Sequence, residues 1–158
     1  MATDPVDLLA ARLALTEARL DLYGLEGRYA RTWDTGDAAG WADLFTDEGV
    51  FEMAAVGGEP GRRVEGRPAL AAFCNEYTGT VTGLHLLHLP EISLEGNRAT
   101  SRLHFEFRAV LRSTPELTQQ SSVAGYYDTT YVLYGSGWRI AHRFEKAVTR
   151  QRAVFYDL

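Results

Sequence analysis

The sequence has 158 residues, about the length of a single domain with one hydrophobic core. Hydrophobic residues make up 46% of it and charged residues 23%, a balance typical of globular proteins and not of disordered ones. The net charge of −5 argues against a nucleic-acid partner, which would need a basic surface to follow its phosphates. Cys74 is the only cysteine, so an internal disulfide and a multi-cysteine metal site are both excluded.

The sequence predicts neither a membrane-spanning segment nor an export signal. No apolar run approaches the roughly 18 to 20 residues that a membrane span requires. The N-terminus, MATDPVDLLA, has an early aspartate where a signal peptide would have basic residues before an apolar segment. We therefore expect a cytoplasmic protein with no membrane partner.

The first third of the chain has the pattern of helices. Apolar residues recur there mostly at spacings of three and four, which predicts one long helix with a single buried face. These residues are Leu8, Leu9, Leu13, Leu15, Leu20, Leu22, Leu25, Tyr29 and Trp33. Gly36 is suited to follow the end of this helix, and Asp37 to cap a second, short helix over Ala38 to Phe45.

The middle of the chain is expected to be mostly turn and loop. Asp47-Glu48-Gly49 predicts a turn, and Val50 to Met53 the first strand. The glycine-rich segment from Ala54 to Gly66 reads as a loop with a short strand at its end, and it lacks the GK[ST] sequence of a phosphate loop. Pro68 favours the start of a third helix that runs to about Tyr77.

From residue 84 onward the period changes to that of strands. Four long strands are predicted, at Leu84 to Leu94, Arg98 to Arg112, Gln119 to Tyr134 and Trp138 to Val148. In the second of them, alternate residues from Ala99 to Leu111 form an apolar face, and the other face carries Arg102, His104, Glu106 and Arg108. Helices followed by a series of antiparallel strands indicate the α+β class.

Asp34 is the first candidate for a functional residue. It falls in the last turn of the long helix, where the negative end of the helix dipole disfavours a carboxylate by roughly 0.3–1 kcal/mol. Either Asp34 is a solvated residue at a loop edge, or another group holds it there.

His88 is the second candidate, within the apolar segment LHLLHLPEI. It is either a core or edge histidine or a catalytic base. His85 lies three residues earlier, and strand alternation places it on the opposite face, which argues against a metal ion held by both. His104 and His142 are expected to be structural or exposed.

Asp34 and His88 together would form a catalytic dyad if the helix end lies over the sheet. A carboxylate that binds one imidazole nitrogen fixes the tautomer and leaves the other nitrogen free as a base. No serine lies on a nucleophile elbow, and Cys74 falls in a predicted amphipathic helix. Proton transfer is therefore favoured over covalent catalysis, with no metal and no cofactor required.

Four segments, taken in order, resemble the SnoaL-like branch of the nuclear transport factor two-like superfamily. They are TWDTGDAAGWADLFTDEGVFE, VEGRPALAAF, HLPEISLEGNRATSRLHFEF and GYYDTTYVLYGSGWRIAHR. The resemblance implies a cone-shaped α+β barrel, with N-terminal helices packed in the concave face of a strongly curved antiparallel sheet around a pocket. It covers a core of about residues 16–146 of a single domain over residues 1–158, with a helical extension at 5–15 and a C-terminal tail at 147–158.

The resemblance also implies a set of site residues. Dehydratases and dehydrochlorinases of this family have a catalytic pair that matches Asp34 and His88. A pocket arginine matches Arg143, and an apolar lining matches Phe105, Phe107 and Tyr127. Trp33 and Met53 stand where a dehydratase has substrate-binding tyrosines, so that substrate is not carried over, and Tyr29 is an alternative polar group.

The leading hypothesis is a cofactor-independent lyase, of dehydratase or dehydrohalogenase type, that acts on a small, mostly apolar cyclic molecule. His88 would remove a C–H proton, Asp34 would orient the imidazole, and Arg143 would stabilise the leaving group. A polyketide-type cyclase or an isomerase is the second hypothesis.

A non-catalytic ligand-binding or assembly domain is the third hypothesis, and it expects Asp34 and His88 to lie apart or the pocket to be filled. The polar face around Arg102 and Arg108 would otherwise be a broad exposed sheet surface, which favours a homodimer or homotrimer.

Overall fold

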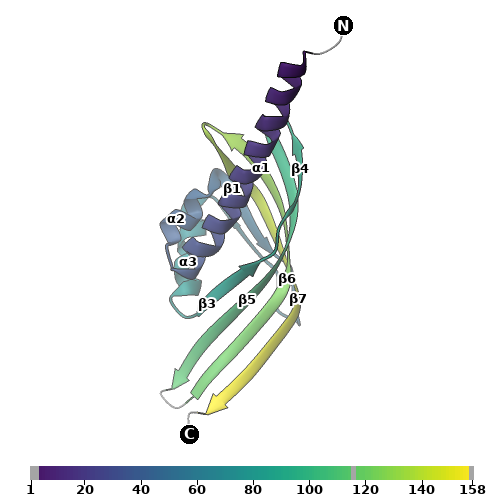
Figure 1. The fold of residues 1–158 in the computed structure, drawn as a ribbon. Helices are drawn as coiled ribbons and strands as arrows, with labels where there is room; N and C mark the ends of the chain where they lie inside the picture. The colour runs from purple at the N-terminus through teal and green to yellow at the C-terminus, as the bar shows by residue number, and fades with distance from the viewer. Residues whose placement is uncertain (1–3, 115–116, 157–158) are drawn as a thin grey trace.

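The computed structural model describes residues 4–114 and 117–156 (Figure 1). Its helices are α1 (Pro5–Asp34), α2 (Ala38–Asp43) and α3 (Arg67–Thr78). Its strands are β1 (Phe45–Met53), β2 (Arg62–Glu65), β3 (Thr82–Leu87), β4 (Glu91–Glu95), β5 (Arg98–Thr114), β6 (Leu117–Tyr134) and β7 (Gly137–Tyr156).

The strands form one seven-stranded sheet in the order β2-β1-β7-β6-β5-β3, with β4 paired to β5 beside this path. Every pair is antiparallel except β1 with β7, which is parallel. The sheet is strongly curved and does not close, and the helices lie on its concave side (Figure 1). The predicted α+β cone is thereby confirmed.

Helix α1 is buried only in its second half. Asp4 caps its start by accepting the Val6 backbone N–H at 2.9 Å, and the chain turns away at Gly36, which has φ 70°. The residues that pack into the core are Leu22, Leu25, Tyr29 and Trp33. The expected buried leucines before them, Leu8, Leu9, Leu13, Leu15 and Leu20, are exposed.

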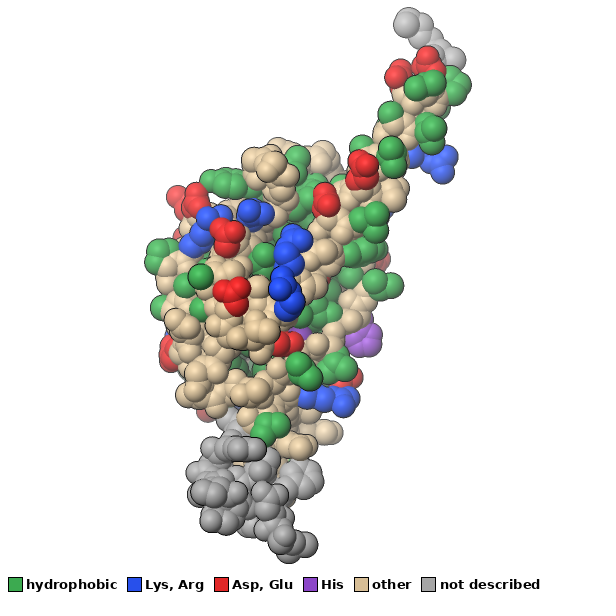
Figure 2. Space-filling view, turned by 60° about the vertical axis from the view of Figure 1, so that its left-hand side comes forward, with side chains coloured by type: hydrophobic (Ala, Val, Ile, Leu, Met, Phe, Trp, Pro, Cys, Tyr) green, Lys and Arg blue, Asp and Glu red, His purple; other side chains and the backbone are tan. Residues whose placement is uncertain are grey.

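For Leu8, Leu9, Leu13 and Leu15 the reason is the length of α1, whose first turns project beyond the sheet (Figures 1 and 2). Leu20 lies beside the sheet but is on the side of the helix opposite the buried Leu22 and Leu25. The apolar residues of α1 mostly follow the 3.6-residue helical period, but only the part of the helix that overlies the sheet has its apolar face buried. Helical periodicity alone cannot locate the point at which the sheet ends.

The core lies between the helices and the inner face of the sheet. The predicted apolar face of β5 is confirmed as far as Ala109, because Ala99, Ser101, Leu103, Phe105, Phe107 and Ala109 are all buried, and the side chain of Leu111 lies outside the described part. The opposite face stays exposed and carries two Arg–carboxylate pairs, Arg102 with Asp128 and Arg108 with Glu106. Trp41 is fully buried and packs at 4.9 Å, centroid to centroid, on Phe45.

The short helix predicted to Phe45 ends at Asp43, and the first strand begins at Phe45 and not at Val50. Three other predicted boundaries differ more. The strand predicted over Leu84 to Leu94 is two strands, β3 and β4, broken near Pro90, which has no backbone N–H to donate to a ladder. The predicted tail at 147–158 instead continues β7 to Tyr156, where it pairs with β6, and residues 157–158 lie outside the described part. The predicted turn at Asp47 lies within β1, at an irregularity in its pairing with β7.

Within residues 4–114 and 117–156, no helix is both long enough and apolar enough to cross a membrane.

Candidate functional site

The end of α1 is tied to strand β3 by two hydrogen bonds between Asp34 and His85. Asp34 Oδ1 lies 2.7 Å from Nδ1 of the His85 ring, and Asp34 Oδ2 accepts the backbone N–H of His85 at 2.9 Å. The two side chains are only 12% and 5% exposed. These contacts explain a carboxylate at the negative end of a helix, because they offset the unfavourable dipole.

The predicted partner of Asp34 was the wrong histidine. His88 is exposed, follows the last residue of β3, and uses its backbone N–H to bond the carbonyl of His104 at 3.0 Å. Strand alternation was correctly expected to place the two histidines on opposite faces. The inward position belongs to His85. Its neighbours Leu84 and Leu86 face outward and are 65% and 44% exposed.

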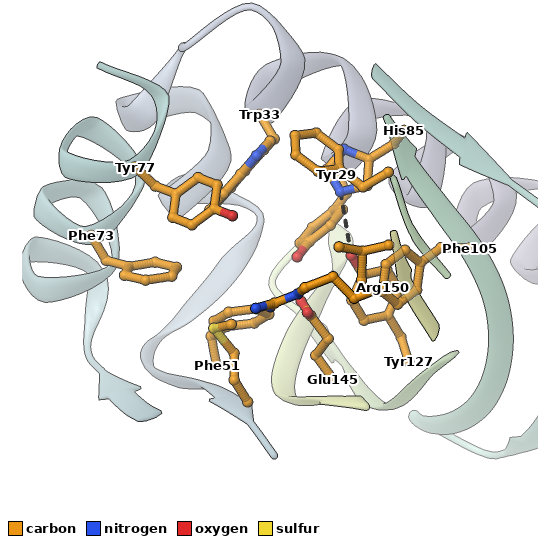
Figure 3. A pocket seen from close by; sticks show the side chains of 13 residues that line it. Tyr29, Trp33, Phe51, Phe73, Tyr77, His85, Phe105, Tyr127, Glu145 and Arg150 are labelled. Atoms are coloured by element: carbon orange, nitrogen blue, oxygen red, sulfur yellow. Dashed lines mark hydrogen bonds between the residues drawn. The ribbon is translucent and has the colours of Figure 1, made fainter. Parts of the chain in front are cut away.

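The Asp34 contact also fixes the protonation pattern of the His85 ring. A carboxylate can only accept a hydrogen bond, so Nδ1 carries the proton in the neutral ring and Nε2 is an unprotonated acceptor. Nε2 lies 3.3 Å from the Tyr127 hydroxyl, inside a pocket (Figure 3). This is the arrangement of a general base that is already oriented.

The pocket lies between the helices and the inner face of the sheet and is mostly aromatic. Its volume is about 50 Å³, within about 500 Å³ of empty space that includes its open mouth. Five residues expected from the sequence line it: Tyr29, Trp33, Phe105, Phe107 and Tyr127. Eight lining residues were not among the expected site residues: Phe51, Met53, Phe73, Tyr77, His85, Val123, Glu145 and Arg150.

Arg143 lies beneath the pocket and does not line it. It is fully buried and forms an ion pair with Glu26 of α1, and its Nε donates to Thr129 Oγ1 at 3.1 Å. Its guanidinium carbon lies 3.9 Å from the centroid of the Tyr29 ring and 4.9 Å from that of Tyr127. Arg143 therefore supports two pocket tyrosines from below, in place of the expected direct contact with a leaving group.

These two tyrosines keep their protons at neutral pH. Burial raises the pKa of both phenols above the ordinary value of 10, although the positive charge of Arg143 acts in the opposite direction. Each hydroxyl can therefore donate a hydrogen bond to an oxygen or nitrogen atom inside the pocket.

Among the residues that the structure describes, Glu145 is the one carboxylate that lines the pocket. On β7 it is paired across the sheet with Tyr127 on one side and with Met53 on the other. Burial raises its pKa from 4.5 to about 7, against the lowering effect of Arg143 and Arg150. A large share of Glu145 is therefore a neutral carboxylic acid at neutral pH, able to donate a proton.

The raised pKa of Glu145 predicts a stability that depends on pH. Since the folded state holds this proton more tightly than the unfolded chain, stability is lost as pH rises from 4.5 to about 7. A pKa shift of this size corresponds to roughly 3 kcal/mol in the free energy of unfolding. Because Glu145 keeps some contact with solvent, we expect a loss of about 1–3 kcal/mol.

Glu145→Gln should therefore raise the free energy of unfolding by this amount at pH 8 and change it little at pH 4.5, as measured by urea denaturation. Glu106→Gln, on the outer face of the sheet, is the matched control. An equal effect of Glu145→Gln at both pH values would contradict the assigned pKa.

A family model described as "SnoaL-like domain" matches residues 14–144. The chain belongs to the SnoaL-like family. Among solved structures, this SnoaL-like chain is similar to an NTF2-like protein with a cystatin-like fold from Novosphingobium aromaticivorans, with 25% identity over 93% of this chain and 92% of the other, and a TM-score of 0.77.

Two further structures are similar to the SnoaL-like chain. A variant of a Mycobacterium tuberculosis protein of unknown function is 27% identical over 93% of this chain and 78% of its own, with a TM-score of 0.68. A ketosteroid isomerase-like protein from Erwinia carotovora atroseptica is 16% identical over 84% and 98%, with a TM-score of 0.70, and shows the shared fold alone. No curated protein matches the chain.

Proposed function

We propose that this SnoaL-like protein is a cofactor-independent enzyme that removes a C–H proton from a small, mostly apolar cyclic molecule. His85 is the general base, and Asp34 orients its ring and stabilises the imidazolium that forms. The observation that carries this proposal is the 2.7 Å contact of Asp34 with His85 Nδ1, which leaves Nε2 unprotonated within the pocket, where a substrate would replace the 3.3 Å contact of the Tyr127 hydroxyl.

The surroundings of His85 favour base catalysis on an apolar ring. The ring centroid of Phe107 lies 4.6 Å from that of His85, and Phe105 stacks on Tyr127 at 4.2 Å, so the wall around the base is aromatic and suits a flat, apolar substrate. The small pocket volume favours a compact substrate. A buried carboxylate that pairs with His85 favours the charged form of the imidazole once it has taken the proton.

The non-catalytic alternative expected Asp34 and His88 to lie apart or the pocket to be filled. Asp34 does not pair with His88, which is exposed, so that expectation is met for the predicted pair. The contact of Asp34 with His85 beside an open pocket nevertheless supports a catalytic pair. We therefore favour an enzyme of the lyase type over a binding or assembly domain.

A general C–H acid tests the proposal without knowledge of the natural substrate. In 5-nitrobenzisoxazole, loss of one ring proton to a base opens the ring in a single step and yields a coloured phenolate, which needs no acid to leave. We expect turnover of this compound that saturates with its concentration. The His88→Gln variant should keep that activity within 3-fold, because His88 is exposed and does not line the pocket. Absence of turnover above that of free imidazole, or its loss in His88→Gln, would contradict the assignment of His85 as the base.

A further inference from the structure

The inner wall of the pocket also carries the carboxyl group of Glu145, at some distance from His85. His85 is on β3 and Glu145 on β7, and β5 and β6 lie between these strands in the sheet. Three strand spacings correspond to roughly 14 Å in a flat sheet, and the distance shortens across a concave one. Figure 3 shows the two side chains reaching into the same pocket from different parts of its wall.

Tyr127 connects the two ends of this wall. Its hydroxyl contacts His85 Nε2 at 3.3 Å, and its backbone is paired with that of Glu145 in the next strand. A small ring that lies against the stacked Phe105 and Tyr127 therefore has a base at one end and a carboxylic acid at the other. In the described part of the chain no hydrogen bond joins His85 and Glu145, so neither side chain occupies the other.

We infer that Glu145 is a second catalytic residue, the general acid that protonates a departing hydroxyl group, and that the substrate class is a small cyclic β-hydroxy carbonyl compound. This inference rests on the proposed function of His85 and adds the identity of the leaving group. An acid at this position is of little use to a halide, which leaves as an anion, but it converts hydroxide into water, a far better leaving group.

The reaction balances as a loss of water. His85 Nε2 takes the proton on the carbon next to the carbonyl, and the electron pair of that C–H bond forms the C=C bond. The C–O bond breaks with its electron pair on oxygen, and the Glu145 proton joins that oxygen to give water. His85 is then an imidazolium and Glu145 a carboxylate, and the site returns to its starting state when solvent removes one proton and supplies the other.

Two further features support the acid role. The positive charge of Arg150, which lines the same pocket, favours the carboxylate that forms on Glu145 as the proton leaves. Tyr29 also lines the pocket and keeps its hydroxyl proton, so it can donate to the substrate carbonyl and make the neighbouring C–H bond more acidic.

A pair of probes that differ only in the leaving group tests the inference. 3-Hydroxycyclohexanone must lose water, whereas 3-acetoxycyclohexanone loses acetate, which leaves without a proton, and both give the same enone. Glu145→Gln should lower kcat/KM for loss of water by about 100-fold and for loss of acetate by less than 3-fold. Glu106→Gln should leave both rates unchanged, since Glu106 is on the outer face of the sheet.

Each other outcome overturns a defined part of the inference. Equal effects of Glu145→Gln on the two probes, or none on either, would show that Glu145 is not the acid. Two results with the wild-type protein would overturn the inference and leave the role of His85 intact. In the first, the protein eliminates acetate but not water. In the second, it eliminates neither but still converts 5-nitrobenzisoxazole. Wild-type protein inactive on all three compounds would overturn the proposed function and the inference with it.

Discussion

Replacing His85 by Gln is expected to lower kcat/KM for 5-nitrobenzisoxazole by about 10²–10⁴-fold, the range typical of a lost general base. Glutamine preserves most of the volume and can still bond Asp34, so the fold should be retained. Asp34→Asn should cause a loss of similar size, although Asp34 does not line the pocket. Initial rates measured with each purified variant give the comparison.

The expected effect of Asp34→Asn comes from its geometry. The His85 backbone N–H donates to one oxygen of Asp34, so the carbonyl oxygen of an asparagine would take that position. Its NH₂ group would then face His85 Nδ1 and donate to it. The ring would be driven to the tautomer with its proton on Nε2, which cannot accept a proton from the substrate.

His88→Gln is the matched control for the base, because it makes the same substitution three residues along the chain at an exposed site. Near-wild-type far-ultraviolet circular dichroism of the His85 and Asp34 variants would show that they remain folded. A folded Asp34→Asn variant with full activity would contradict the role of Asp34 in fixing the tautomer.

The sequence was most informative where the pattern is local and repeated. Alternation along β5 correctly assigned its buried face. The unfavourable carboxylate at the end of α1 raised two alternatives, and the structure shows the one in which another group holds Asp34. Both conclusions depend on geometry that a single helix or strand fixes by itself. The choice between His85 and His88 depends instead on which face of the strand meets the helices.

His85 was missed because the segment around it is apolar on both faces. Leu84, Leu86 and Leu87 surround it, so alternation separates His85 from His88 but does not say which of them faces the helices. Pro90 is the one local signal, since a strand that ends before it leaves His88 at the edge.

Glu145 could have been found from Arg143. Residues two apart in a strand share a face, so an arginine expected to point inward places Glu145 inward as well. The burial of Arg143 against Glu26 was not predictable in this way, because it depends on how α1 crosses a strand more than 100 residues later in the chain.

Removing either partner of the Glu26–Arg143 pair is expected to be the most destabilising single change in this protein. Both side chains are almost completely excluded from water, at 4% and 0% exposure. Glu26 also accepts a hydrogen bond from the Tyr131 hydroxyl at 2.5 Å, and Ser101 lies 2.7 Å from that hydroxyl. Arg143→Met should lower the free energy of unfolding by about 3–5 kcal/mol, because the Glu26 charge would remain buried without its counter-charge.

The exposed pair of Arg102 and Asp128 is the matched control, since it has the same chemistry with side chains that are 54% and 41% exposed. Arg102→Met should cost less than about 1 kcal/mol, because water and salt already screen that pair. In the double variant Glu26→Gln with Arg143→Met no net charge stays buried, so the loss should be well below the sum of the two single losses. Urea denaturation at pH 7 measures all four variants. Additive losses for Glu26 and Arg143, or a cost of Arg143→Met no greater than that of Arg102→Met, would show that the pair does not hold α1 against the sheet.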